Sequence, residues 1–185
     1  MKNPKISVII PTFNQEKYIG RCIRSLLEQN IPRENYELIL INDASIDKTE
    51  YAISLFRKPK SNFIKYLSNK INQGLPASIN RGIKIAKGKY IVRVDSDDFV
   101  NKNFLNFLAL YLETNPKSDA VACDYLVLDD NENVIERKNA TDFPIACGIM
   151  FKKNQLIEIG MYDEKFMYNE EKELRIRFCK KYKIK

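Results

Sequence analysis

Three carboxylates crowd the end of an apolar run near the middle of the sequence. The segment "YIVRVDSDDFV", residues 90–100, has strand character and then places Asp95, Asp97 and Asp98 within four positions. Like charges this close repel, and each carboxylate needs water, a hydrogen-bond donor or a cation. Such a cluster taken alone is more often a solvated turn than a cation site, so its place in the fold must decide.

The sequence contains no histidine. This excludes a Ser-His-Asp triad, a Cys-His pair and any histidine-ligated metal site. Acid–base chemistry near neutral pH would therefore fall to carboxylates, Lys, Tyr or Cys. A bound metal would have to be a hard, oxygen-preferring ion such as Mg²⁺ or Mn²⁺.

Glycine-rich phosphate-binding loops are also missing. Neither a GxGxxG segment nor a P-loop follows the first apolar run, and the whole chain has only 6 glycines. A diphosphate bound here would need another source of positive charge. A divalent cation on Asp97, with Asp95 nearby, would supply it, because Mg²⁺ is typically held by one or two carboxylates and by substrate phosphates.

Two further segments carry acids whose role the residues alone leave open. In "NDASIDKT", Asp47 fits the N-cap of a helix, whereas Asp43 stands at a strand end and could accept from a base N–H or a ribose hydroxyl. In "YNEEKELRIRF", the three acids fit a favourable first helical turn, or one of them is a general base for an acceptor hydroxyl. These three acids are Glu170, Glu171 and Glu173.

The first half of the chain alternates strand and helix patterns. The expected strands cover residues 5–10, 36–41, 63–67 and 90–94. The helices between them cover residues 15–29, a stretch after Asp47, and a stretch from Leu75 to a C-cap near Gly88. This order indicates a parallel, doubly wound α/β sheet, in which ligands bind beyond the carboxyl ends of the strands. Polar clusters follow three of the strands, which favours a site there.

The second half is less regular. It contains an amphipathic helix over 101–114, two strands around an Asp-Asn turn within 119–136, a short strand over 147–153 and a helix over 154–160. A last helix over 169–182 has acids first and bases last, which suits the helix dipole. We see no linker or repeat, so we expect one domain over residues 1–185.

Five segments occur in an order that resembles the inverting family 2 glycosyltransferases with the GT-A fold. They are "SVIIPTFNQEKYIGRCIRSLLEQ", "YELILINDASIDKT", "NQGLPASINRGIKIAKGKYIVRVDSDDF", "GIMFKKNQLIEIGMYDEKF" and "NEEKELRIRF". The resemblance implies a Rossmann-like, mostly parallel sheet flanked by helices. It also implies metal-assisted transfer of a sugar, with inversion, from a nucleoside diphosphate sugar to a hydroxyl of a glycan or lipid-linked acceptor. A UDP-sugar is the favoured donor, Mn²⁺ or Mg²⁺ the cofactor, and polysaccharide biosynthesis of the cell envelope the setting.

The resemblance carries over to individual residues. Asp97 would ligate the metal and Glu171 would be the general base, so these two are the expected catalytic residues. Asp43 would contact the base of the nucleotide, and Asp95 the ribose or donor sugar. The expected donor-binding set is Pro11, Thr12, Asn14, Asp43, Asn72, Gly74, Asn80, Asp95 and Ser96.

The sequence departs from the family pattern in the acids of the base segment. The usual Glu-Asp pair is Glu170-Glu171 here, and Glu173 stands where Asp is commoner. The resemblance divides the chain into a nucleotide-sugar half, 1–100, and an acceptor and base half, 101–185, which many members extend. A nucleotidyltransferase and a non-catalytic nucleotide-sugar-binding domain are the alternatives.

Composition limits the surroundings and partners of the protein. No apolar run reaches the roughly 20 residues of a membrane-spanning helix, and the N-terminus lacks the layout of a signal peptide. We expect a cytoplasmic protein with four reduced cysteines. The net charge of +7 and the basic tail "KKYKIK" fit peripheral association with the inner face of a membrane, or simply a solvated surface. No nucleic-acid pattern is present, and the sequence leaves the oligomeric state open.

Overall fold

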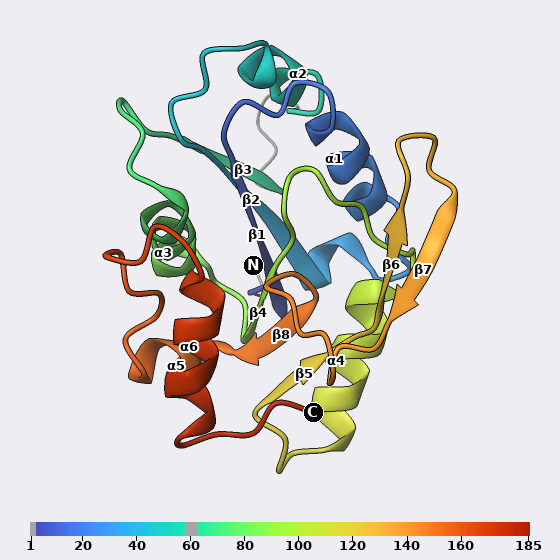
Figure 1. Ribbon diagram of the computed structural model, residues 1–185, viewed down its shortest axis with the longest axis vertical. Coiled ribbons are helices and arrows are strands. Elements are labelled where there is room, and N and C mark those ends of the chain that lie inside the picture. Colours follow the sequence, from blue (N-terminus) through green and yellow to red (C-terminus); the bar gives the residue numbers. More distant parts are fainter. Residues whose placement is uncertain (1–2, 58–62) are drawn as a thin grey trace.

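A computed structural model describes residues 3–57 and 63–185 of the chain. Its centre is a six-stranded sheet with the order β3-β2-β1-β4-β8-β5, covered by helices on both faces (Figure 1). The α/β class with a mostly parallel sheet is as the sequence predicts. The polar clusters after β1, β2 and β4 therefore lie at one edge of the sheet.

Four strands form the parallel part of the sheet. They are β1 (Ile6–Thr12), β2 (Tyr36–Asn42), β3 (Ile64–Ser68) and β4 (Tyr90–Arg93). β1 pairs with both β2 and β4, and every residue of β1 and β2 is buried. Continuous β-branched and leucine-rich runs suit such strands, because helices cover both of their faces.

The second half completes the sheet with antiparallel strands. β8 (Ile149–Lys152) lies between β4 and β5 (Ala120–Ala122). β6 (Tyr125–Leu128) and β7 (Val134–Lys138) form a separate hairpin. The prediction of two strands within 119–136 is therefore wrong. The stretch makes three strands, because its first residues join the main sheet before the chain leaves it at residue 123.

Two apolar cores lie on the two faces of the sheet. One contains α1 (Ile19–Leu27), α2 (Thr49–Ser54) and α4 (Phe104–Thr114). The other contains α3 (Leu75–Ile85), α5 (Lys153–Glu158) and α6 (Glu170–Cys179). A short 3-10 turn, η1 (Arg33–Asn35), leads into β2. None of the described helices is both long and apolar enough to cross a membrane.

Two predicted helix ends are wrong. α3 stops at Ile85 rather than near Gly88, and a Cβ on Gly88 would lie 2.5 Å from the backbone nitrogen of Ser7. Gly88 thus permits a close approach to β1 and does not cap the helix. The N-cap of α2 is Lys48, one residue after Asp47, although the Asp47 carboxylate still accepts from the Thr49 N–H at 2.9 Å.

Candidate active site at the carboxyl edge of the sheet

The loops after β1 and β2 are fastened to each other. Asn14, in the left-handed conformation (φ 54°), accepts from the Ile46 N–H at 2.9 Å, and its own N–H donates to the Ser45 hydroxyl at 3.0 Å. Pro11 and Thr12 lie inside β1 and are buried. Of the expected donor residues in this part, Asn14 is therefore the exposed one.

Asp43 is buried and organises the segment that leads to α3. One carboxylate oxygen accepts from the Asn69 side chain at 2.6 Å and from the Gln73 N–H at 2.9 Å. The other accepts from the Gly74 N–H at 2.9 Å. Asn72 also accepts from that Gly74 N–H, at 3.0 Å. The structure thus brings Asp43, Asn72 and Gly74 together.

Asn80 lies deeper than a ligand-lining residue. It is only 3% exposed, and its side chain exchanges hydrogen bonds with the backbone of Tyr162 at 2.8 and 3.0 Å. It also donates to the Glu164 carboxylate at 3.0 Å. These contacts attach α3 to the segment that precedes α6.

A buried arginine on β4 joins the acidic cluster to the start of α6. The Arg93 guanidinium donates to both oxygens of Asp95, at 2.5 and 3.1 Å, and to Glu170 at 2.9 Å. Arg93 and Glu170 are each 6% exposed. Burial by itself would lower the pKa of Arg93, but the facing carboxylate of Asp95 helps to raise it well above its ordinary value. Arg93 is not among the residues predicted for the site, although a charged residue inside an apolar strand signals a buried partner.

The acids of the "DSDD" turn have three different environments. Asp95 is held by Arg93, and Ser96 is buried. Asp97 is exposed, and its carboxylate forms no hydrogen bond or ion pair within the described ranges. Desolvation raises the pKa of Asp98, and the charges of Asp95 and Asp97 raise it further, against a hydrogen bond from Cys147.

Cys147 completes a cluster with two of these acids. Its sulfur and carboxylate oxygens of Asp95 and Asp98 lie within 4.8 Å of one another. The Asp95 N–H donates to the sulfur at 3.0 Å. Burial and the two carboxylates raise the thiol pKa well above its ordinary value, so the thiol is protonated at neutral pH. No local pattern in the sequence marks Cys147, because the pairing of β8 with β4 brings it to this turn.

The three glutamates of α6 also differ in their hydrogen-bond and ion-pair partners. Glu170 is bound to Arg93, and Glu173 is paired with Arg177. Glu171 is partly exposed and its carboxylate has no hydrogen bond or ion pair in the part of the chain that is described. Among these acids, Glu171 is therefore free to act on a bound molecule.

Comparison with known proteins gives the family of this fold and site. The family model described as "Glycosyl transferase family 2" matches residues 7–175, which is most of the chain. The chain belongs to glycosyltransferase family 2. The resemblance that the motifs indicate is thus confirmed.

Members of this family supply similar sequences and structures. A poly(ribitol-phosphate) beta-glucosyltransferase of Bacillus spizizenii is 40% identical over 102 residues, which are 55% of this chain and 16% of the relative. The structure of Staphylococcus aureus TarS 1-349 in complex with UDP superposes with a TM-score of 0.79 at 23% identity, covering 97% of this chain and 56% of that one. A Pyrobaculum calidifontis mannosyltransferase in complex with GDP-Man and Mn²⁺ has a TM-score of 0.79 at 21% identity, covering 100% and 55%.

These likenesses confirm the GT-A fold. The chain spans only about half the length of the solved structures and a sixth of the Bacillus relative.

The family 2 site offers suitable groups for a divalent metal. The exposed Asp97 carboxylate is next in sequence to Asp98, whose pKa is raised first by desolvation and then by the charges of Asp95 and Asp97. Oxygen ligands and uncompensated negative charge suit Mg²⁺ or Mn²⁺. The protonated thiol of Cys147 is not a ligand for such hard ions, so the fit rests on the carboxylates.

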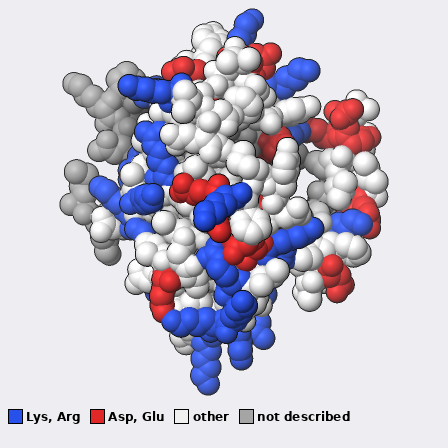
Figure 2. Space-filling view, turned by 60° about the vertical axis from the view of Figure 1, so that its left-hand side comes forward, with Lys and Arg blue, Asp and Glu red and all other residues white. Residues whose placement is uncertain are grey.

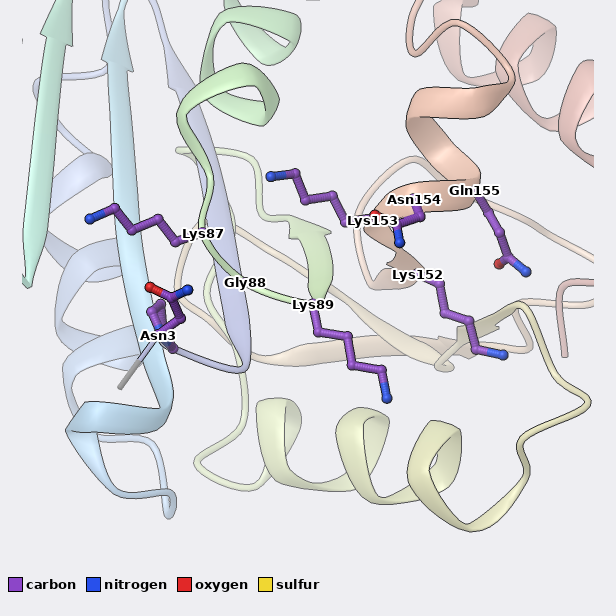
Figure 3. Close-up of a pocket in the computed structure, with 9 residues that line it drawn as sticks. Asn3, Lys87, Gly88, Lys89, Lys152, Lys153, Asn154 and Gln155 are labelled. Atoms are coloured by element: carbon purple, nitrogen blue, oxygen red, sulfur yellow. The ribbon is translucent and has the colours of Figure 1, made fainter. Parts of the chain in front are cut away.

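A hollow lies at the edge of the sheet opposite the acidic turn. Its volume is about 570 Å³, and its lining includes Lys87, Lys89, Lys152 and Lys153 (Figure 3). None of these four lysines forms an ion pair within residues 3–57 and 63–185. The amino groups of Lys87 and Lys153 point to one side and those of Lys89 and Lys152 to the other (Figure 3). The hollow therefore spreads its charge instead of focusing it on one point.

Further basic side chains lie toward the same end of the molecule. Figure 2 shows Lys and Arg side chains gathered at the lower end of the face that carries α3, α5 and α6. The C-terminal segment lies there too, since the Ala122 N–H donates to the Lys185 carbonyl and Ala120 bridges to Ile184. This basic end is separated from the acidic site by the length of β4.

Proposed function

We propose that this protein is an inverting glycosyltransferase that moves a sugar from a UDP-sugar to a hydroxyl of a glycan or lipid-linked acceptor. One observation carries the proposal. The guanidinium of Arg93 contacts both Asp95 of the "DSDD" turn and Glu170 at the start of α6. It thereby places the expected donor-binding acids beside the expected base segment.

The donor side of the proposal uses the loops at the carboxyl edge. Asn14 would line the nucleotide pocket, and the segment that Asp43 organises, with Asn72 and Gly74, would close over the nucleotide. Asp95 would accept from the ribose or the donor sugar with the lone pairs that Arg93 leaves unused. The UDP and GDP-Man complexes of the structural relatives support a nucleoside diphosphate sugar as the donor class.

The proposed cofactor is Mn²⁺ or Mg²⁺, held by Asp97 with Asp98 nearby. A bound divalent ion would offset the charge that develops on the departing diphosphate. The Mn²⁺ in the Pyrobaculum complex supports this choice. Arg21 also stands at the turn, where its guanidinium donates to the Asp97 carbonyl at 2.8 Å and thereby helps to fix the turn.

The proposed base is Glu171. Inversion requires a base on the face of the sugar opposite the leaving group, where it takes the proton of the attacking hydroxyl. Glu170 and Glu173 already bind arginines, which leaves Glu171 as the unengaged acid of the helix. The names of the poly(ribitol-phosphate) relatives support a hydroxyl-rich polymer of the cell wall as the acceptor class.

A donor screen tests this function. Thermal unfolding would be followed with UDP- and GDP-sugars, with and without Mn²⁺, and nucleotide release would be measured for every sugar that raises the melting temperature. We expect a UDP-sugar to stabilise the protein and to be hydrolysed slowly in a Mn²⁺-dependent way. A protein that no nucleotide sugar stabilises, and that releases no nucleotide, would not be a glycosyltransferase.

The same screen separates the two alternatives. A nucleotidyltransferase would release pyrophosphate from a nucleoside triphosphate, and family membership does not favour it. A non-catalytic binding domain would be stabilised by the donor but would release nothing.

We also propose that the protein works in the cytoplasm at the inner face of the membrane. The positive charges of the lysines that line the hollow opposite the acidic turn, and the +7 net charge, would favour an anionic lipid surface.

A further inference from the structure

Arg93 makes more contacts than the packing of a strand requires. Its guanidinium plane faces Asp95 with two N–H groups and turns a third to Glu170. Its charge also acts on the hydroxyl of Tyr162, a residue that is 4% exposed; burial raises the pKa of Tyr162 to about 12 although Arg93 lowers it. The burial of an arginine this deep is offset only when its charged partners are held in good hydrogen-bonding geometry.

We infer that Arg93 is a positioning residue that sets the Asp95 carboxylate and the first turn of α6 as one unit. The inference rests on the proposed function, because it assigns a task within that reaction. Arg93 itself would touch neither donor nor acceptor, since it is buried behind Asp95 and Glu170.

The donor half of this task follows from the geometry of Asp95. The bidentate contact fixes the plane of the carboxylate. The backbone of Asp95 is held as well, because its N–H donates to Cys147 and its carbonyl accepts from the Cys22 thiol at 3.5 Å. The Asp95 side chain is still 29% exposed, so lone pairs remain for a hydroxyl of the donor.

The effect of Arg93 on the proposed base follows from helix geometry. Glu170 points inward to Arg93, and its side chain is only 7% exposed. Successive residues of an α-helix are turned by about 100° about its axis. Fixing Glu170 therefore fixes the direction of Glu171, the proposed base. A lysine at position 93 would keep the charge but could not reach both carboxylates with a rigid fork.

Three variants test the inference in hydrolysis of the donor identified by the screen. Glu170→Gln should lower kcat at least about tenfold, because a shift of about 1 Å in a catalytic group can cost about 100-fold, and should leave the donor KM within about twofold. Arg93→Lys should lower kcat and raise KM together, because it releases Asp95 too. Arg177→Lys is the matched control, since Arg177 also ties α6 to the segment before it but contacts neither Asp95 nor Glu170.

The combined variant sharpens the comparison. If Arg93 and Glu170 act as one unit, Arg93→Lys with Glu170→Gln should lose much less kcat than the product of the two single losses. Should Arg93→Lys fail to fold, the split between kcat and KM in Glu170→Gln carries the test. Unchanged kinetics in both single variants, or equal losses in Arg177→Lys, would overturn this inference and leave the proposed function standing. A wild-type protein without any donor turnover overturns it together with the proposed function.

Discussion

At the scale of single residues, the site divides its work among acids of identical chemistry. Asp95 is held by an arginine, Asp98 is crowded by like charges, and Asp97 is open. Glu170 and Glu171 differ in the same way, although they are neighbours. Environment rather than residue type thus assigns the roles.

Asp97→Ala should remove the main metal ligand. We expect the affinity for UDP measured with Mn²⁺ to fall at least about tenfold, which corresponds to about 1.4 kcal/mol, while the weaker affinity without metal stays unchanged. Isothermal titration calorimetry would measure both. Asp130→Ala, an exposed acid in the turn of the β6–β7 hairpin, is the control and should bind like the wild type. Equal Mn²⁺ dependence in Asp97→Ala and the wild type would place the metal elsewhere.

Glu171→Gln should separate binding from chemistry. General-base catalysis contributes about 10²–10⁴-fold, so we expect turnover to fall by at least about 100-fold while the dissociation constant of UDP changes less than about twofold. Glu173→Gln on the same helix should retain turnover, because the wild-type Glu173 carboxylate is already engaged by Arg177. Intact turnover in Glu171→Gln would mean that another group is the base.

The acids of this site could be predicted from the sequence, but the side chains that bind and orient them could not. Asp95, Asp97 and Glu171 stand out because acids that are clustered in the sequence can be recognised without a structure. Arg93, a charged residue inside an apolar strand, signals a buried partner, but the identity of that partner appears only when α6 is placed against β4. Cys147 lies 52 positions from Asp95 along the chain, and hydrogen bonding over that separation depends on topology rather than local pattern.

At the scale of elements, the segment between β3 and α3 depends on one glycine. Gly74 has φ 88°, and a Cβ there would lie 3.1 Å from the terminal carbon of Met167. Gly74→Ala should therefore destabilise the protein by about 1–2 kcal/mol and weaken donor binding. Urea unfolding measures the first effect. Gly20→Ala, in α1 and with nothing closer than 3.8 Å, should be neutral or stabilising, and an equally neutral Gly74→Ala would show that the segment is not constrained.

Glu37 of β2 contacts Ser7 of β1 and Lys65 of β3, and the stability that these contacts add depends on pH. Burial alone would raise its pKa, but hydrogen bonds from Lys65, Ser7 and the Lys87 N–H lower it below 4.5 on balance. A depressed pKa adds stability that is complete above about pH 4.5 and is lost as the pH falls through the folded-state value. We expect the wild type to lose stability from pH 6 to pH 3, and Glu37→Gln to lose less over that range.

The comparison for Glu37→Gln is urea unfolding at both pH values. At pH 6 the variant should be less stable than the wild type by about 1–3 kcal/mol, because Lys65 loses its charged partner. An identical pH slope in the two proteins would show that other groups cause the acid sensitivity.

Elements were predictable where a single physical signal dominates. β1, β2 and β4 are mostly apolar runs, and the parallel sheet follows from their alternation with helices. One error lies where a single residue type serves two purposes. A glycine after a helix fits a C-cap, yet Gly88 is required by the backbone of β1, and sequence alone cannot separate these two uses.

At the scale of the whole molecule, the acidic turn lies at one edge of the sheet and the lysine-lined hollow at the other. We expect the protein to co-sediment with vesicles that contain phosphatidylglycerol at low salt, and much less at 0.5 M salt. Replacing Lys87, Lys89 and Lys152 by Gln should reduce binding, whereas the same change at Lys17, Lys48 and Lys70 should not. Binding that ignores both lipid charge and salt would argue against the proposed membrane surface.

The position of β8 has a consequence for synthesis of the chain. β4, which leads directly into the acidic turn, has β1 on one side, and its other neighbour is β8. About 55 residues separate the end of β4 from the start of β8. At about 5–20 residues per second, a ribosome needs roughly 3–11 s to cover that distance. During this interval the nascent chain presents an unpaired strand edge beside its future active site, which makes that edge the natural place for a chaperone to bind.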